Sequence, residues 1–222
     1  HNSVIVGDDI LFCLDKLPQY LETKLKRRGE PQPEDSRLMY IDLRTGDIIR
    51  EETEDIFGTW LGYSTEHKLL LQATRPCRDM LHGEDGNRMI VYDTEKGIKV
   101  WDKPIQYSNP PIIHNDKIYT EGIGFHLFTG EPLTETDPIT GEEQKWSFKR
   151  EYGCGIVAAS EHLLTFRSAS AGFINLDALA GIEGTASLGG WKPGCSTNLI
   201  VADGVLNSPD YTRTCQCPYQ KQ

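Results

Sequence analysis

The sequence lacks any long apolar run. None of its hydrophobic stretches approaches the roughly 18–20 consecutive residues that a membrane-spanning helix needs, so no membrane span is predicted. Positive charge is also scarce, with 23 Lys and Arg against 33 Asp and Glu and a net charge of −10. Because no positive field would attract a polyanion, the composition argues against nucleic acid or an anionic membrane surface as the partner.

Several local signatures of catalytic and metal sites are missing as well. The sequence has no Gly-x-Ser-x-Gly elbow for a hydrolase nucleophile and no Cys-x-x-Cys pair for zinc, thiol exchange or haem attachment. It also has no Asp-x-Asp-x-Asp-Gly loop for calcium. We therefore predict no catalytic residue and no metal ligand from motifs.

What the sequence does contain is a repeat. An Asp followed four residues later by Gly recurs between apolar runs, which is a pattern that opens and closes a tight turn. The copies begin at Asp42, Asp93, Asp137 and Asp177, and His126 begins a degenerate copy ending at Gly130. A second family of short polar turns alternates with the first, at residues 7–9, 66–68, 115–117, 161–162 and 203–204.

Two interleaved turn families with a step of about 40–50 residues indicate about four strands per repeat, the length of a propeller blade. The expected fold is all-β: a β-propeller of four-stranded antiparallel blades, with about four blades and part of a fifth in one domain over residues 1–222. Residues 17–28 interrupt the pattern. Their apolar spacing predicts a short amphipathic helix that ends at Gly29.

The Asp-x-x-Thr-Gly-x-x-x-x-Trp signal, best seen from Asp93 to Trp101 and from Asp137 to Trp146, resembles the repeat of pyrroloquinoline-quinone-type β-propellers. Four further stretches resemble quinoprotein-like propeller domains of exported planctomycete-type bacterial proteins. They are residues 57–64 (Phe57-Gly58-Thr59-Trp60 onwards), 152–155, 189–195 and 215–219.

This resemblance implies a fold and a compartment more than an activity. It implies an extracellular or periplasmic, non-catalytic scaffold or binding module with a protein or glycan partner. The alternatives are a quinone-dependent dehydrogenase and a propeller polysaccharide lyase. Quinone-using members carry adjacent cysteines and a calcium site, whereas Gln216 separates Cys215 from Cys217, so neither the quinone nor calcium is expected.

The resemblance also bears on ring closure. Quinoprotein rings have seven or eight blades, so this chain either belongs to a longer polypeptide whose remainder completes the ring, or closes as an unusually small ring. We expect the first.

Cysteines and a few large side chains are the remaining candidates. Four cysteines, Cys154, Cys195, Cys215 and Cys217, lie in the last third beside turn-forming residues, which is typical of a disulfide set in an oxidising compartment. Buried thiols are the alternative, and Cys13 is expected to be one.

Arg167 precedes a run of small residues and could bind an anionic ligand, or form a salt bridge between blades. The four tryptophans are evenly spaced, and we interpret them as packing between blades. A ligand platform, with Trp191 as a candidate contact, is the alternative.

Overall fold

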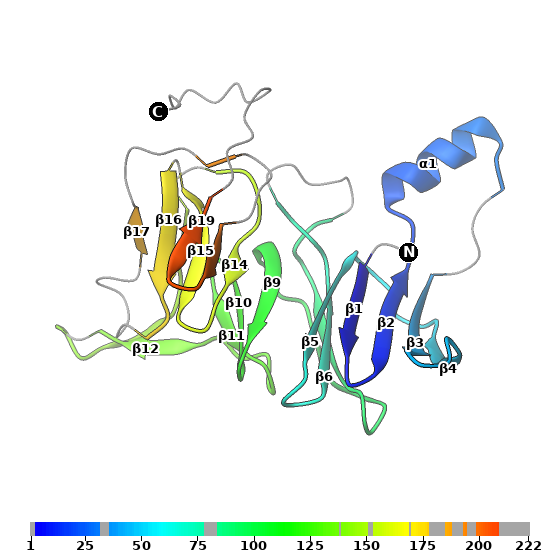
Figure 1. The fold of residues 1–222 in the computed structure, drawn as a ribbon, viewed down its shortest axis with the longest axis horizontal. Coiled ribbons are helices and arrows are strands. Elements are labelled where there is room, and N and C mark those ends of the chain that lie inside the picture. The colour runs from blue at the N-terminus through cyan, green and yellow to red at the C-terminus, as the bar shows by residue number, and fades with distance from the viewer. Residues whose placement is uncertain are drawn as a thin grey trace.

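The computed structural model describes residues 3–31, 36–77, 84–137, 139–150, 153–168, 170–177, 185–187, 193–194 and 199–208. Four-stranded antiparallel sheets follow one another along the chain and stand side by side (Figure 1). In each sheet the strands lie in sequence order, which is the arrangement of a propeller blade.

The first two sheets are complete. The first sheet contains β1 (Ser3–Gly7), β2 (Ile10–Asp15), β3 (Arg37–Asp42) and β4 (Ile48–Glu52). The second contains β5 (Trp60–Ser64), β6 (Leu69–Ala73), β7 (Met89–Asp93) and β8 (Ile98–Lys103).

The later sheets are less regular. The third sheet contains β9 (Ser108–His114), β10 (Lys117–Glu121) and β11 (Gly124–His126), and a single bridge from Phe125 to Pro132 stands where a fourth strand would pair. The fourth sheet contains β14 (Ala158–Ala159), β15 (Leu163–Ser168), β16 (Ser170–Asn175) and β17 (Thr185–Ser187). A fifth begins with β18 (Ile200–Ala202) and β19 (Val205–Asn207). The prediction of four blades and part of a fifth is confirmed.

The ring is incomplete and not closed, so the small closed ring considered from the sequence is wrong. The innermost strands β1, β5, β9 and β14 contact one another in turn, as strands do around a propeller axis. The outer strands fan away from them.

The hydrophobic core lies between the sheets rather than inside any one of them. One buried cluster joins the first and second sheets through Phe12, Leu38, Leu70 and Ile90. A second joins the second and third sheets, and a third joins the third and fourth. Because strand side chains alternate between the two faces, each inner sheet offers one apolar face to each neighbour.

The predicted helix is present as α1 (Gln19–Arg28). It ends at Gly29, whose φ of 68° is the left-handed conformation that glycine adopts without strain. No side chain of α1 is buried, and the helix extends away from the sheets between β2 and β3 (Figure 1).

All five short turns predicted from the second family connect the first two strands of a sheet. Asp8 and Asp9 both have positive φ, as do Asp203 and Gly204, which is the geometry of a tight two-residue hairpin.

The Asp turns need a partial correction. Asp42 and Asp93 each accept two backbone N–H groups on Oδ1 and connect the third and fourth strands of their sheets. In the third sheet this place is taken by the degenerate copy, in which the N–H of Gly130 donates to the carbonyl of His126 (2.8 Å). The Asp137 turn instead closes an additional hairpin between β12 (Thr134–Thr136) and β13 (Glu143–Lys145).

In the fourth sheet Asn175, two residues before the predicted Asp177, makes a side-chain contact like that of Asp42. The Oδ1 of Asn175 accepts the N–H of Asp177 at 3.0 Å. Gly181, expected to close that turn, lies outside the described residues.

Candidate functional site

In the first four sheets, one equivalent position lies five residues after the hairpin turn, at the end of the second strand or one residue before it. This position holds Leu14, Ala73, Glu121 and Arg167 in the first to fourth sheets. Leu14 and Ala73 join hydrophobic clusters between sheets. The third and fourth sheets have a charged side chain at this position. Charged groups therefore replace the apolar side chains that the first two sheets place there.

Glu121 lies at the centre of a buried polar cluster in the third sheet. Its Oε2 accepts hydrogen bonds from Arg150 Nε at 2.8 Å and Asn109 Nδ2 at 3.2 Å, and its Oε1 accepts the backbone N–H of Arg150 at 3.2 Å. Arg150 also donates to the carbonyl of Gly155 at 3.2 Å. The side chains of Arg150 and Glu121 are only 5% and 17% exposed. Protein groups therefore satisfy this ion pair, which ties the segment before β14 to β9 and β10.

A small hollow, with no room for a water molecule, lies beside this cluster. It is lined by Glu121 and by Pro110, Tyr119, Thr120, Phe148, Val157 and Leu164. Its wall is mostly apolar, and Glu121 is held by the partners just described.

Arg167 is 2% exposed, so its guanidinium is in the protein interior rather than on an open face. A Cβ on Gly153 would collide with the carbonyl of Arg167, and a Cβ on Gly58 would collide with that of the equivalent Ala73. Glycine is therefore needed where the chain crosses from one sheet to the next over the end of the second strand. Trp191, the other predicted ligand contact, lies outside the described residues.

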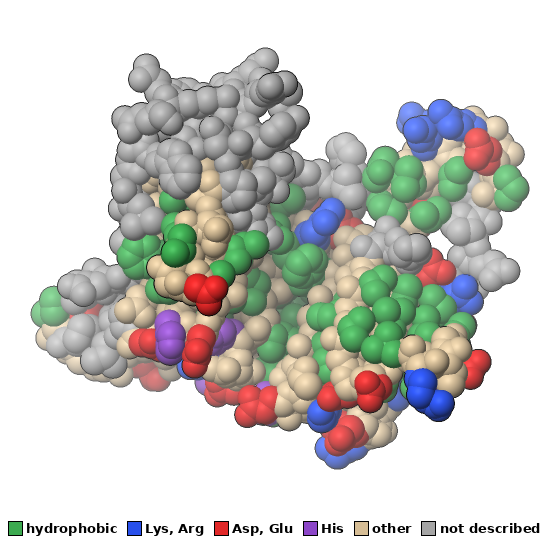
Figure 2. Space-filling view, in the orientation of Figure 1, with side chains coloured by type: hydrophobic (Ala, Val, Ile, Leu, Met, Phe, Trp, Pro, Cys, Tyr) green, Lys and Arg blue, Asp and Glu red, His purple; other side chains and the backbone are tan. Residues whose placement is uncertain are grey.

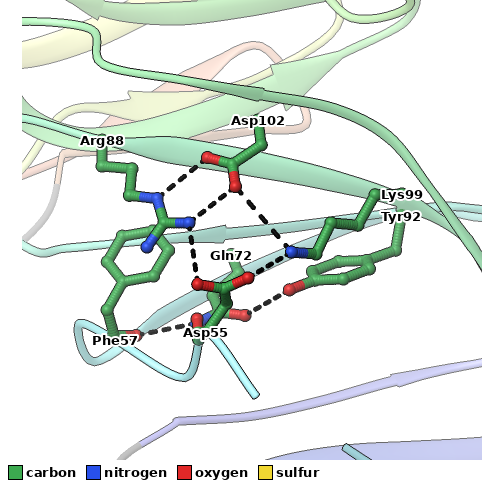
Figure 3. Close-up of polar contacts among 7 residues, drawn as sticks. All are labelled: Asp55, Phe57, Gln72, Arg88, Tyr92, Lys99 and Asp102. Atoms are coloured by element: carbon green, nitrogen blue, oxygen red, sulfur yellow. Dashed lines mark hydrogen bonds and ion pairs between the residues drawn. The ribbon is translucent and has the colours of Figure 1, made fainter.

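A second polar cluster joins the linker before β5 to the outer strand of the second sheet (Figure 3). Arg88 donates to both carboxylate oxygens of Asp102 at 2.8 and 2.6 Å and to Asp55 at 3.2 Å, and Lys99 also donates to Asp55. The guanidinium of Arg88 lies over the ring of Phe57, 5.0 Å from its centroid. These hydrogen bonds, with Lys99 first and Arg88 second, lower the pKa of Asp55 below its ordinary value.

Gln72 completes this cluster from the sheet interior. Its Nε2 donates to the carbonyls of Asp55 and Phe57 at 3.2 and 3.1 Å, and its Oε1 accepts the Tyr92 hydroxyl at 3.1 Å. Burial raises the pKa of Tyr92, so this hydroxyl stays protonated and donating. The cluster thus contains two cationic side chains, two carboxylates and an amide whose oxygen and nitrogen are both hydrogen-bonded. Together these contacts fix the linker to the second sheet.

The two turn families meet at one edge of the molecule, which we call the turn rim. It consists of the hairpins at residues 7–9, 66–68, 115–116, 161–162 and 203–204 and the outer turns at 42–46, 93–97 and 126–130. In four sheets a backbone N–H just after the start of the outer turn donates to a hairpin carbonyl, in the pairs Leu43 to Asp9, Thr94 to Lys68, Leu127 to Asp116 and Leu176 to His162.

Neighbouring sheets are joined at the turn rim. Asp8 of the first sheet accepts hydrogen bonds from Lys68 at 2.7 Å and from Tyr63 at 2.5 Å, and these lower its pKa. His114 contacts the carbonyl of Glu161 at 2.9 Å. Acidic and histidine side chains gather along this edge (Figure 2). The residues exposed there include Asp9, Glu66, Asp116, Glu161 and His162.

The tryptophans described by the structure pack between blades, as expected. The indole Nε1–H of Trp60 donates to the carbonyl of Pro111, and that of Trp101 donates to Leu127, both at 2.8 Å. Trp146 packs against Tyr119 and Phe148, in the core between the third and fourth sheets.

The predicted disulfide set stays a prediction. Cys154 is half-buried, and Cys195, Cys215 and Cys217 lie outside the described residues. Cys13 is a buried thiol, as expected, and burial raises its pKa.

In the part of the chain that the structure describes, no three His, Cys, Asp or Glu side chains are grouped to hold a metal ion. Nor is any described helix long and apolar enough to cross a membrane.

Comparison with known proteins identifies the fold. No family model matches the chain, and no curated protein matches it. Among solved structures, it is similar to BamB from Moraxella catarrhalis, with 15% identity, a TM-score of 0.51, and coverage of 92% of this chain and 53% of that one.

Two further similar structures have lower TM-scores. The quinohemoprotein alcohol dehydrogenase ADHIIG from Pseudomonas putida HK5 is 14% identical, with a TM-score of 0.49 and coverage of 92% of this chain and 37% of that one. The β-propeller domain of Cps50 (Swd1) from Myceliophteria thermophila is 11% identical, with a TM-score of 0.48 and coverage of 93% and 64%.

This chain thus spans about half the length of BamB. Its fold is an incomplete β-propeller of the type seen in BamB.

Proposed function

We propose that the chain is one propeller domain that serves as a non-catalytic scaffold or binding module of an exported bacterial protein, and that it binds a protein or glycan on the turn rim. The observation that carries this proposal is the gathering of both turn families at one edge. Loops held by a rigid sheet scaffold are where binding residues concentrate.

The construction of the rim supports this use. Each outer turn is fastened to the hairpin of its own sheet by a backbone hydrogen bond. Contacts such as Lys68 to Asp8 and His114 to Glu161 fasten one sheet to the next. A surface ordered before binding loses less conformational entropy when a partner docks.

Charge narrows the class of partner. Exposed carboxylates dominate the rim hairpins at Asp9, Glu66, Asp116, Glu161 and Asp203, and the whole chain carries a net charge of −10. Such a surface favours a partner with cationic or hydroxyl groups and disfavours a polyanion.

The test is a binding comparison between two charge-reversed proteins. In the rim variant, Glu66, Asp116 and Glu161 are replaced by Lys; in the control, Lys24, Lys26 and Arg27 of α1 are replaced by Glu. Immobilised proteins are probed with a panel of purified envelope proteins and neutral, acidic and amino-sugar glycans. We expect at least one ligand whose binding falls about tenfold or more in the rim variant, a loss of about 1.4 kcal/mol, and is unchanged in the control.

A ligand that binds both variants equally would place the binding surface elsewhere. Conversion of a glycan to unsaturated products, or a bound absorbance band after addition of quinone and calcium, would contradict the non-catalytic assignment.

A further inference from the structure

Helix α1 concentrates positive charge in an otherwise acidic protein. The chain has 23 Lys and Arg against 33 Asp and Glu, whereas α1 carries Lys24, Lys26, Arg27 and Arg28 with Glu22 as its acid. Figure 2 shows Lys and Arg side chains gathered over α1. Because charges more than about 8–10 Å away are largely screened in physiological salt, the net charge of the whole chain does not describe the field around this helix.

The cations of α1 are not neutralised by neighbouring side chains. Within the described ranges, Lys24, Lys26 and Arg27 form no ion pair and no side-chain hydrogen bond, and Arg28 reaches Glu30 at 4.0 Å. In the first two sheets, by contrast, cations pair with carboxylates at Arg37, Arg50, Lys68, Arg88, Lys99 and Lys103. The positive charge of α1 is therefore available to a partner.

The residues of α1 separate into two faces. In a helix, residues three or four apart in the sequence lie on the same side. One side, which we call the basic face, consists of Tyr20, Leu21, Lys24, Leu25, Arg27 and Arg28. The opposite side consists of Gln19, Glu22, Thr23 and Lys26. The apolar side chains thus share one face with three of the cations, and the acid lies on the other.

The sheets do not cover the basic face. No residue of α1 is buried, Tyr20 is 41% exposed, and the helix extends away from the sheets (Figure 1). A helix as short as α1 is marginal in water unless one of its faces packs against another surface. The basic face therefore needs a partner that combines negative charge with an apolar layer.

An anionic lipid surface has both properties. Helices with Lys and Arg beside Leu and aromatic residues lie in the headgroup region of membranes. Their long aliphatic stems let Lys24 and Arg28 reach the phosphates while Leu21 and Leu25 enter the apolar layer. Since α1 extends beyond the sheets, it also holds the acidic part of the protein away from a surface of the same charge.

We propose that α1 binds an anionic membrane surface by lying on it with the basic face toward the lipid headgroups. The helix rests on the surface and does not cross it. The first sheet pairs its strands without contacts from α1, so substitutions in the helix test binding without disturbing the blades. This inference does not rest on the turn rim, and the two proposals can fail separately because different variants test them.

The experiment is co-sedimentation of the full chain with phosphatidylcholine vesicles that contain about 30% phosphatidylglycerol, and with phosphatidylcholine vesicles alone. We expect binding to the anionic vesicles at about 0.05 M salt, with a partition coefficient that falls at least about tenfold at about 0.5 M salt because of screening. The neutral vesicles should bind at least about tenfold more weakly.

Two charge-reversed proteins locate the binding surface. The helix variant carries Lys24→Glu, Arg27→Glu and Arg28→Glu. The sheet variant is its matched control, with the same change in net charge at exposed cations outside α1: Arg44→Glu, Lys145→Glu and Lys149→Glu. Each cation near an anionic surface strengthens binding about fivefold, so the helix variant should lower the partition coefficient at least about 100-fold. The sheet variant should lower it less than about threefold.

A third variant tests the apolar part of the basic face. Leu21→Gln with Leu25→Gln keeps the charge and uses a good helix former, and it should lower the partition coefficient about tenfold. Circular dichroism checks that all three variants fold.

Several results would overturn the proposal. The wild type might as well lack the helix if it fails to bind anionic vesicles, and equal losses in the helix and sheet variants would show that net charge governs binding. Unchanged binding of the leucine variant would exclude insertion of the apolar side chains. If vesicles do not bind, and a purified acidic envelope protein binds the wild type but not the helix variant, α1 serves a protein partner instead.

Discussion

Glu121 and Arg167 occupy a position that the first two sheets fill with Leu14 and Ala73. Burying a charge costs several kcal/mol unless other groups compensate it. Arg150 and Asn109 supply that compensation for Glu121. The same strand end can thus hold either an apolar contact or a satisfied ion pair.

This pairing leads to a prediction about stability. Glu121→Gln should lower the free energy of unfolding by about 3–5 kcal/mol, because it leaves the buried guanidinium of Arg150 without a counter-charge. The double variant Glu121→Leu, Arg150→Met should lose less than the sum of its single variants. Urea unfolding of all these proteins measures the coupling; additive losses would show that the pair does not act as a unit.

The sequence analysis singled out Arg167 as a candidate functional residue, but it did not single out Glu121. The sequence did contain a pattern that points to Glu121, because Glu121 and Arg167 each lie five positions after a hairpin turn. It becomes visible only when the turns are aligned, because Lys117–Glu121 reads by itself as an ordinary strand with a polar end. Sequence reasoning gave Arg167 two alternative roles, an anion contact or a salt bridge between blades; the structure places its side chain in the interior.

At the scale of elements, hairpins are the part that sequence predicts best. Asp8, Asp9 and Asp203 adopt positive φ, and their residue type favours that conformation wherever they stand. The same local rule cannot tell a turn within a blade from an added hairpin. The Asp137 turn has the same side-chain hydrogen bonds as the Asp42 turn. Only long-range pairing separates them.

The tryptophan contacts between sheets lead to a second prediction. Trp101→Phe should lower the free energy of unfolding by about 1–3 kcal/mol, because the buried carbonyl of Leu127 loses its donor. Val100→Ala, at an exposed neighbour on β8, should change stability by under about 0.5 kcal/mol. Thermal unfolding compares the two variants; equal effects would mean that the indole hydrogen bond adds nothing to the packing.

At the scale of the whole molecule, the sheets are joined by apolar cores and, at their edges, by carboxylates. Asp8 links the first sheet to the second through Lys68 and Tyr63, and Asp55 fastens the connecting linker through Lys99 and Arg88. Both carboxyl groups have lowered pKa values because of these cations and donors. Their contribution is therefore present above the ordinary aspartate pKa and is lost as the pH falls through the lowered values.

We accordingly expect the unfolding midpoint in urea to hold steady from pH 7 to about pH 5 and to fall below about pH 4. The paired variant Asp8→Asn, Asp55→Asn should be less stable at pH 7 and show a shallower fall in acid. An equally steep fall in that variant would show that other carboxylates govern the acid transition.

Helix α1 has no buried side chain and connects β2 with β3, two strands whose pairing runs through six residues from Ile10 and Asp42 to Asp15 and Arg37. The pairing of strands in the first sheet therefore does not depend on contacts made by α1. A circular permutant with new termini inside α1 should therefore keep its blades. The same holds for a variant that carries a fluorophore or an inserted domain in α1, so this helix is a suitable site for modifying the protein.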